Sequence, residues 1–187
     1  MYWLRNPESI QAAIMRTNWY VMVLAGIVVG VIVYACIFWC IIAYSRRRNA
    51  HAAQFTGNVP LEITLTLLSL AIVVGLFVNT YAAEVPVDYV SANPQNRIHV
   101  TAFRWSWGFD YNGGRIRQAG TPQAPPSLYL PVNRTTRIDL TTADVNHSFW
   151  IPAFLFKRDA IPGMTNSFDL TPTRVGTYLS RCAQFCG

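Results

Sequence analysis

Two long stretches without a charged residue constrain this chain more than any other feature of it. Residues 17–45 contain no Asp, Glu, Lys or Arg, and neither do residues 63–83. A helix needs about 20 mainly apolar residues to cross the hydrocarbon core of a bilayer, and both stretches meet that requirement. Helices of a soluble protein keep a polar face, which a charge-free run of 29 residues lacks. We therefore predict two transmembrane helices, at 19–45 and 61–83.

The short segment between the two stretches predicts how they are oriented. It contains SRRRNAH, with three consecutive arginines at 46–48. Short arginine-rich loops stay on the cytoplasmic side of a membrane. We therefore expect residues 46–60 to form a cytoplasmic loop, and residues 1–18 and 84–187 to lie on the other side. A signal peptide is not expected, because the first apolar stretch is too long and no small-residue cleavage pattern follows it.

Residues 84–187 have the pattern of an all-β domain. Short runs alternate apolar and polar residues, and turn-forming sequences such as NGG and APP separate them. This alternation predicts a β-sandwich or barrel. We expect strands in four segments, RIHVTAF, SLYLPV, TRIDLTT and GTYLSRC.

One segment of this domain, FRWSWGFDY, is unusually aromatic. It has an aromatic residue at every second position, namely Phe103, Trp105, Trp107, Phe109 and Tyr111. Side chains alternate between the two faces of a strand, so a single strand would present all five on one face. That face would pack in the core or against a partner. A tryptophan at its edge could instead be exposed, where a redox partner docks.

The chain closes with SRCAQFCG, in which Cys182 and Cys186 are four positions apart. The domain is expected in an oxidising compartment, so from the spacing alone a disulfide and a metal site are equally well supported. The spacing is not specific, because Cys36 and Cys40 repeat it within the first apolar stretch. There the small thiols are expected to serve only as apolar packing groups.

A histidine upstream favours the metal. His147, in TADVNHSFWIPAF, precedes Cys182 by 35 residues. A lone histidine in a β domain is more often structural, but together with two thiolates it is typical of sites for copper, zinc or iron–sulfur clusters. Iron–sulfur clusters usually take more cysteines, and structural zinc takes four closed ligands. Copper is therefore the favoured metal.

The motifs FRWSW, ADVNHSF, KRDAIPG and RCAQFCG, after a two-span hairpin, resemble subunit II of the haem–copper cytochrome c oxidases over nearly the whole chain. The resemblance implies that residues 84–187 form a cupredoxin-like, Greek-key β domain with a dinuclear copper A centre. In that family, two cysteine thiolates bridge the coppers, and two histidines, a methionine and a backbone carbonyl complete the site.

The resemblance assigns roles position by position. His147 matches the first copper histidine, and Cys182 and Cys186 match the bridging thiolates. Gln184 stands where the family has a glutamate that offers its backbone carbonyl to copper. Trp105 matches the tryptophan through which electrons arrive.

Two carboxylates also match. Glu62 corresponds to the carboxylate at the entrance of a proton channel into the catalytic subunit, although its place in a first helical turn explains it equally well through the helix dipole. Asp144 matches the aspartate of the DV-x-HS motif. The implied function is to accept electrons from cytochrome c and pass them to haem in subunit I, where oxygen is reduced to water. The implied partners are subunits I and III, cytochrome c and the lipid of a bacterial plasma membrane or an equivalent energy-transducing membrane, with no nucleic acid.

Three departures from the family pattern modify these expectations. The second copper histidine and the methionine would follow four and seven residues after the second cysteine in the family pattern, so we read the sequence as truncated. Gln184 lacks the carboxylate that binds magnesium at the subunit I interface in the family, and an amide is a weaker ligand for a hard cation. Magnesium binding is therefore not expected to be strong. Met164 replaces an arginine that is common in the family.

The charge of residues 84–187 bears on the electron donor. This segment has ten basic and seven acidic residues, and Arg115 and Arg117 lie in a stretch without an acid. We therefore expect an acidic cytochrome, or one tethered within a respiratory supercomplex. Two alternatives remain open from the sequence. One is a copper-free structural subunit II of a quinol-oxidase-type complex, and the other is a membrane-tethered thiol–disulfide protein.

Overall fold

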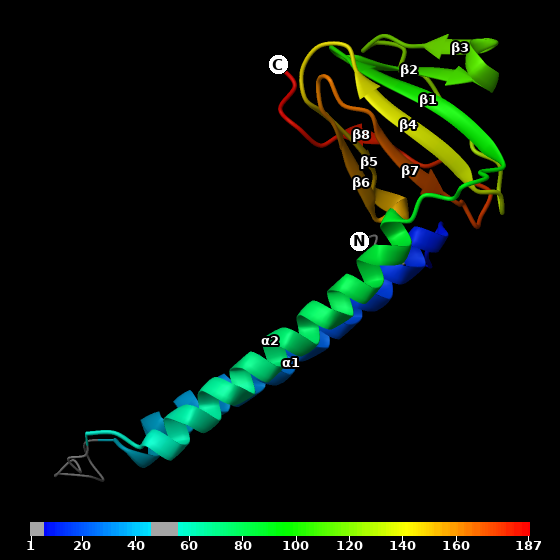
Figure 1. Ribbon diagram of the computed structural model, residues 1–187. Coiled ribbons are helices and arrows are strands. Elements are labelled where there is room, and N and C mark those ends of the chain that lie inside the picture. The colour runs from blue at the N-terminus through cyan, green and yellow to red at the C-terminus, as the bar shows by residue number, and fades with distance from the viewer. Residues whose placement is uncertain (1–5, 46–55) are drawn as a thin grey trace. The chain divides into compact units, whose positions relative to one another are not determined.

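A computed structural model of the chain describes residues 6–45 and 56–187 (Figure 1). The chain divides into two compact units. The helical unit comprises residues 17–82, and the β unit comprises residues 83–187 together with the N-terminal segment up to Arg16. The arginines at 46–48, on which the predicted orientation rests, lie outside the described residues.

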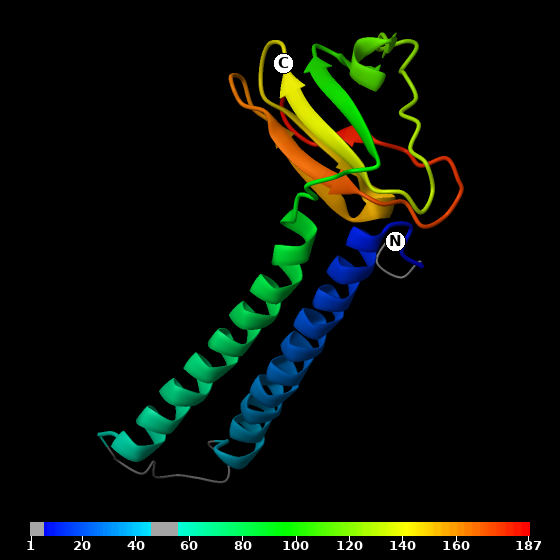
Figure 2. The ribbon, with the colours of Figure 1, turned by 45° about the vertical axis from the view of Figure 1, so that its right-hand side comes forward.

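Two helices contain the charge-free stretches. Helix α1 spans Ile10–Ala43 and α2 spans Val59–Asp88. Both are long and apolar enough to cross a membrane, because neither contains a run of polar residues that would interrupt a span. Within the helical unit they run side by side (Figure 2), and Asn79 Nδ2 donates a hydrogen bond to Asn18 Oδ1 at 2.5 Å.

Helix α2 begins with a reciprocal cap. The Leu61 amide donates to Asn58 Oδ1 at 3.2 Å, and the Asn58 amide donates to Glu62 Oε1 at 3.2 Å. These bonds satisfy backbone donors that the first turn of a helix leaves without a partner. The Glu62 side chain therefore has a structural role in the cap.

Two sheets form the β unit (Figure 1). The larger sheet has the strand order β3-β2-β1-β4-β7. Its strands are β1 (Asn96–Phe103), β2 (Ser106–Tyr111), β3 (Ile116–Ala119), β4 (Thr136–Thr142) and β7 (Asn166–Leu170). The smaller sheet has the order β6-β5-β8, with β5 (His147–Ile151), β6 (Phe156–Ala160) and β8 (Arg181–Cys182). Two 3-10 turns, at Asn112–Gly114 and Pro152–Phe154, follow β2 and β5.

The core of the β unit follows from the alternation in its strands. Ile98, Val100 and Ala102 on β1 are at most 3% exposed, and Ile138 and Leu140 on β4 are fully buried. They join phenylalanines of both sheets in one hydrophobic cluster. Strands β1 and β4 pair in parallel, whereas the other pairs are antiparallel. The predicted fold class is confirmed in its architecture, because two long apolar helices are followed by an all-β domain of two sheets.

Two of the four predicted strands are correct. RIHVTAF lies in β1 and TRIDLTT is β4. SLYLPV forms no strand, and one of its amides, that of Tyr129, donates to the Tyr111 hydroxyl instead of to a neighbouring strand. Pro125 and Pro126 precede this segment and Pro131 lies within it, and a proline lacks the amide that a ladder requires, which explains the error. GTYLSRC contributes only the two residues of β8.

The prediction for the aromatic segment is wrong in one respect. FRWSWGFDY is not a single strand but a hairpin, in which Phe103 of β1 pairs with Ser106 of β2 across the two-residue turn Arg104–Trp105. Partners across a ladder share a face, so Trp107 lies on the core face opposite Ala102, whereas Phe103 lies on the other face. Trp105 is in the turn and is 59% exposed, which agrees with the alternative that an edge tryptophan is exposed.

The N-terminal segment is part of the β unit. The Ile10 amide donates to the Thr171 carbonyl at 3.1 Å, and the Thr173 amide donates to the Glu8 carbonyl at 2.9 Å. The buried Gln11 side chain binds backbone atoms on both sides of Leu170, at Asp169 and Thr171. These bonds attach the N-terminal segment to the end of β7 and the residues that follow it. The sequence pattern does not predict this contact.

Candidate metal centre

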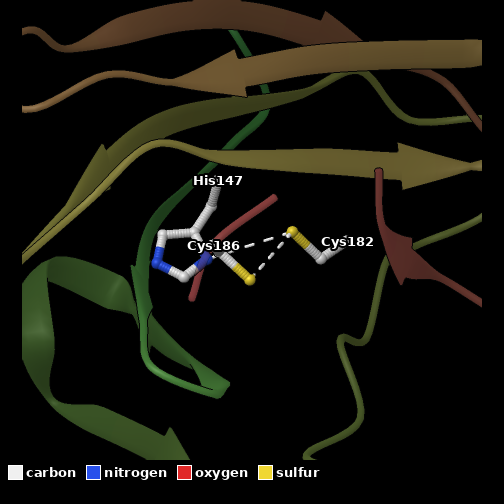
Figure 3. A group of neighbouring side chains, drawn as sticks. All are labelled: His147, Cys182 and Cys186. Atoms are coloured by element: carbon white, nitrogen blue, oxygen red, sulfur yellow. Dashed lines mark hydrogen bonds between the residues drawn. The ribbon is translucent and has the colours of Figure 1, made fainter. Parts of the chain in front are cut away.

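Three side chains with metal-binding atoms meet in the smaller sheet (Figure 3). His147 opens β5, Cys182 lies on β8, and the two strands pair with Cys182 opposite Phe149. Cys186 follows four residues later. Cys182 Sγ lies 3.9 Å from Cys186 Sγ and 3.9 Å from His147 Nδ1. The three potential ligand atoms all lie within 4.8 Å of one another, so a single small site can engage all of them.

The two sulfurs are thiols and not a disulfide. All four cysteines of the chain are free, and the Sγ–Sγ distance of 3.9 Å far exceeds the roughly 2.05 Å of a disulfide bond. The backbone carbonyl of Gln184 is close as well, with its oxygen 3.7 Å from Cys182 Sγ. The amide of Ser148 points at the same sulfur from 3.5 Å. Soft sulfur, imidazole and carbonyl donors therefore converge.

Asp144 sets the orientation of the histidine. His147 is 2% exposed, and its Nε2 lies 2.9 Å from Asp144 Oδ1. An ionised carboxylate only accepts hydrogen bonds, so Nε2 carries the proton and Nδ1 presents a lone pair toward Cys182. The bond from His147, helped by donors from Val145 and Arg104, holds the pKa of Asp144 well below its usual range. The sequence motif had placed Asp144 near this site without showing what it binds.

Burial affects the second thiol. Desolvation raises the pKa of Cys186, and the adjacent Cys182 sulfur raises it further. Two thiolates side by side repel each other, and a cation between them removes that repulsion. Metal ligation by sulfur requires the thiolate form, so this pair favours a site in which the bound ion supplies the compensating charge.

A cavity of about 220 Å³ adjoins the three residues. Trp105 and Arg181 line it, together with the loop that contains Thr121, Pro122 and Pro125. Trp105 Nε1 donates to the Gly187 carbonyl at 3.1 Å, which connects the exposed indole to the residue that follows Cys186. The loop was missed by sequence reasoning, because APP was interpreted only as a turn signal and loops carry no periodicity.

Trp107 is a second residue that the sequence did not single out for this site. Its ring centroid lies 6.1 Å from that of His147 and 5.7 Å from that of Phe149, both at edge-to-face angles. The Trp107 indole therefore packs against the His147 imidazole on the side of the hydrophobic core. Of the other sequence candidates, Glu62 belongs to the helical unit and Met164 is exposed in the turn before β7.

The chain was compared with known proteins. The family model for the periplasmic domain of cytochrome c oxidase subunit II matches residues 110–187. A Streptomyces avermitilis protein described as probable cytochrome c oxidase subunit 2 is 34% identical, over 97% of this chain and 70% of that protein. Cytochrome c oxidase subunit 2 of Mycobacterium tuberculosis is 28% identical, over 97% of this chain and 67% of that protein.

The chain is also similar to solved structures. The periplasmic domain of subunit II of cytochrome oxidase from Bradyrhizobium japonicum has a TM-score of 0.46 and 29% identity, over 52% of this chain and 78% of that one. The assignment rests on the sequence relatives, one of which shares a third of its residues over most of both chains. The chain belongs to the cytochrome c oxidase subunit II family.

Proposed function

We propose that this chain is the electron-accepting subunit of an aerobic terminal oxidase, with a dinuclear copper A centre held by His147, Cys182, Cys186 and the backbone carbonyl of Gln184. As a family member it is a component of an oxidoreductase complex and breaks no bond by itself. The observation that carries the proposal is the convergence of two free thiols and one oriented imidazole within 4.8 Å. This donor set fits copper, because thiolate and imidazole are the ligands that copper prefers in proteins.

Each residue has a distinct task in this proposal. Bound copper would supply one-electron chemistry at this site. Cys182 and Cys186 would hold it through their sulfurs, and the Ser148 amide, 3.5 Å from Cys182 Sγ, orients that sulfur. Asp144 keeps the imidazole in the tautomer that binds metal. Rigid strands on both sides resist changes of geometry, which keeps the reorganisation needed for electron transfer small.

Trp105 is proposed as the residue through which electrons arrive. Its indole is exposed to a partner on one side and hydrogen-bonded to Gly187 on the other, next to Cys186. We further propose that electrons continue to haem in subunit I, with subunit III as another partner, and that cytochrome c, free or held in a larger respiratory assembly, is the donor. The membrane is then the plasma membrane of a bacterium or an equivalent energy-transducing membrane. Gln184 offers no carboxylate, so magnesium is not part of the proposal.

The chain provides a matched test of the copper site, because Cys36 and Cys40 repeat the spacing of Cys182 and Cys186 inside α1. In the purified complex, Cys182→Ser is expected to abolish the near-infrared band and the mixed-valence electron paramagnetic resonance signal of copper A. Cys36→Ser is expected to leave both unchanged. Wild-type complex that contains subunit I but neither signal would contradict the proposal and favour a copper-free subunit of the quinol-oxidase type.

A further inference from the structure

The β unit neutralises its own carboxylates, and this leaves a positive surface beside Trp105. All six aspartates between residues 83 and 187 have a Lys or Arg nitrogen within 4.0 Å, and so does Glu8 of the N-terminal segment. The one acid of the β unit without such a partner among the described residues is Glu84, on α2. A close ion pair acts at a distance only as a dipole, so unpaired charges dominate the field that a partner meets on approach.

Between residues 83 and 187, three arginines have no carboxylate of the described residues within that distance, namely Arg115, Arg134 and Arg181. The sequence expectation had relied on Arg115 and Arg117. Arg117 is in fact paired with Asp110 at 3.4 Å. Arg115 follows the turn at the far end of β2, a six-residue strand, and is therefore about 17 Å or more along the strand from the turn that holds Trp105.

Arg181 is the unpaired charge beside the proposed electron-accepting tryptophan. It is exposed on β8, next to Cys182, and lines the same cavity as Trp105. Asp144, whose carboxylate binds His147 and the backbone of the Trp105 turn, has only 21% of its side chain exposed and is shared between Arg104 and His147. The unpaired charge on the surface around Trp105 is therefore the positive charge of Arg181.

We propose that the surface formed by Trp105 and Arg181 docks an acidic c-type cytochrome, one of whose carboxylates pairs with Arg181. The inference rests on the proposed electron-accepting function and specifies the partner. Opposite charges on two approaching surfaces raise the association rate, and like charges lower it. Among the described residues, a basic cytochrome meets no unpaired carboxylate at this face, and Arg181 repels it.

The test uses the purified oxidase complex with two c-type cytochromes of similar reduction potential, one acidic and one basic. The dissociation constant of each oxidised cytochrome and the rate of electron transfer from each reduced one are measured as functions of ionic strength. The acidic cytochrome is expected to bind more tightly at low salt, and its rate is expected to fall as salt screens the attraction. Arg181→Gln is expected to weaken binding of the acidic cytochrome about two- to fivefold at low salt and to flatten its salt dependence.

Arg134→Gln is the matched control, because it removes the same charge at a distant place. Arg134 precedes β4, and Asp144 follows it, so a seven-residue strand of about 20 Å separates Arg134 from the Trp105 turn. This variant is expected to change neither binding nor salt dependence by a comparable amount. Equal effects of the two variants, or tighter binding of the basic cytochrome at low salt, would overturn the proposal.

Failure of this inference is distinguishable from failure of the proposed function. A complex that lacks the copper A spectrum refutes the proposed function, and the docking surface with it. A complex that has the spectrum and is reduced by a small uncharged reductant, but that shows no preference for the acidic cytochrome, retains the proposed function and refutes only the docking surface.

Discussion

Asp144 joins the candidate copper histidine to the turn that carries Trp105. Its carboxylate lies 2.9 Å from His147 Nε2 and accepts from the Arg104 amide at 2.8 Å. Loss of such a support of a metal-binding histidine typically lowers metal affinity 10- to 100-fold. We predict that Asp144→Ala lowers copper retention by about that factor, measured as copper content after dialysis against a chelator series. Asp110→Ala is the control, because Asp110 also pairs with an exposed arginine but lies on β2 away from the thiols; equal losses in both would show that Asp144 does not support the site.

Glu62 has two candidate roles that one substitution separates. Its Oε1 accepts from the Asn58 amide in the cap of α2, and the family resemblance makes it the entrance of a proton channel. Glu62→Gln keeps an oxygen acceptor for the cap but removes the ionisable proton, whereas Glu62→Ala removes both. We predict that Gln and Ala slow proton uptake by the reduced complex similarly, measured by stopped-flow with a pH indicator. If the Glu62→Gln variant takes up protons at the wild-type rate, Glu62 has no role in proton entry and serves only in the cap of α2.

At the scale of elements, a buried ion pair holds the segment between α2 and β1 against the sheet. Arg137 on β4 and Asp169 on β7 have 9% and 6% of their side chains exposed, and their N–O distance is 2.5 Å. Both also bind the backbone of Ser91, Arg137 at its carbonyl and Asp169 at its amide. Removal of one partner from a buried pair leaves a charge without compensation, which typically costs about 3–5 kcal/mol.

We therefore predict that Arg137→Leu strongly lowers the thermal midpoint of the β unit, measured on the full chain in detergent by calorimetry. The double variant with Asp169→Asn should recover part of the loss, because no unpaired charge remains buried. Arg117→Leu is the control. It breaks the ion pair with Asp110, and because the Arg117 and Asp110 side chains are 76% and 32% exposed, water compensates the carboxylate that remains. A loss in the control as large as in Arg137→Leu would contradict the prediction.

The helices and strands also show which parts of the fold the alternation of apolar and polar residues can predict. β1 and β4 could be predicted because each has one face in the hydrophobic core, which forces apolar residues into every second position. The prediction of one strand for FRWSWGFDY is wrong because its aromatic residues keep alternating through a hairpin turn. The alternation therefore does not indicate that the chain reverses between Phe103 and Ser106. His147, Cys182 and Cys186 could be named from their chemistry. The β5–β8 pairing that brings them together could not, because two residues of β8 are too few to carry a pattern.

At the scale of the whole molecule, the N-terminal segment, which includes the first turns of α1, belongs to the same folded unit as the strands far along the sequence. Gln11, 7% exposed, donates from Nε2 to the Asp169 carbonyl at 3.1 Å and accepts the Thr171 amide at 3.3 Å. Asp169 thereby binds Gln11, in the first turn of α1, through its backbone and Ser91, which follows α2, through its side chain. The β unit thus includes the start of α1 as well as the residues that follow α2.

We predict that Gln11→Ala destabilises the β unit by about 1–3 kcal/mol, because it leaves a buried amide and a buried carbonyl without partners. The sharper readout is hydrogen exchange, in which the Thr171 amide should exchange faster while amides in the middle of β4 keep their protection. Gln123→Ala, in the exposed loop after β3, removes an amide side chain of equal size and should change neither quantity. Unchanged protection at Thr171 in the Gln11 variant would mean that residues 83–187 hold this edge of the sheet without help from the N-terminal segment.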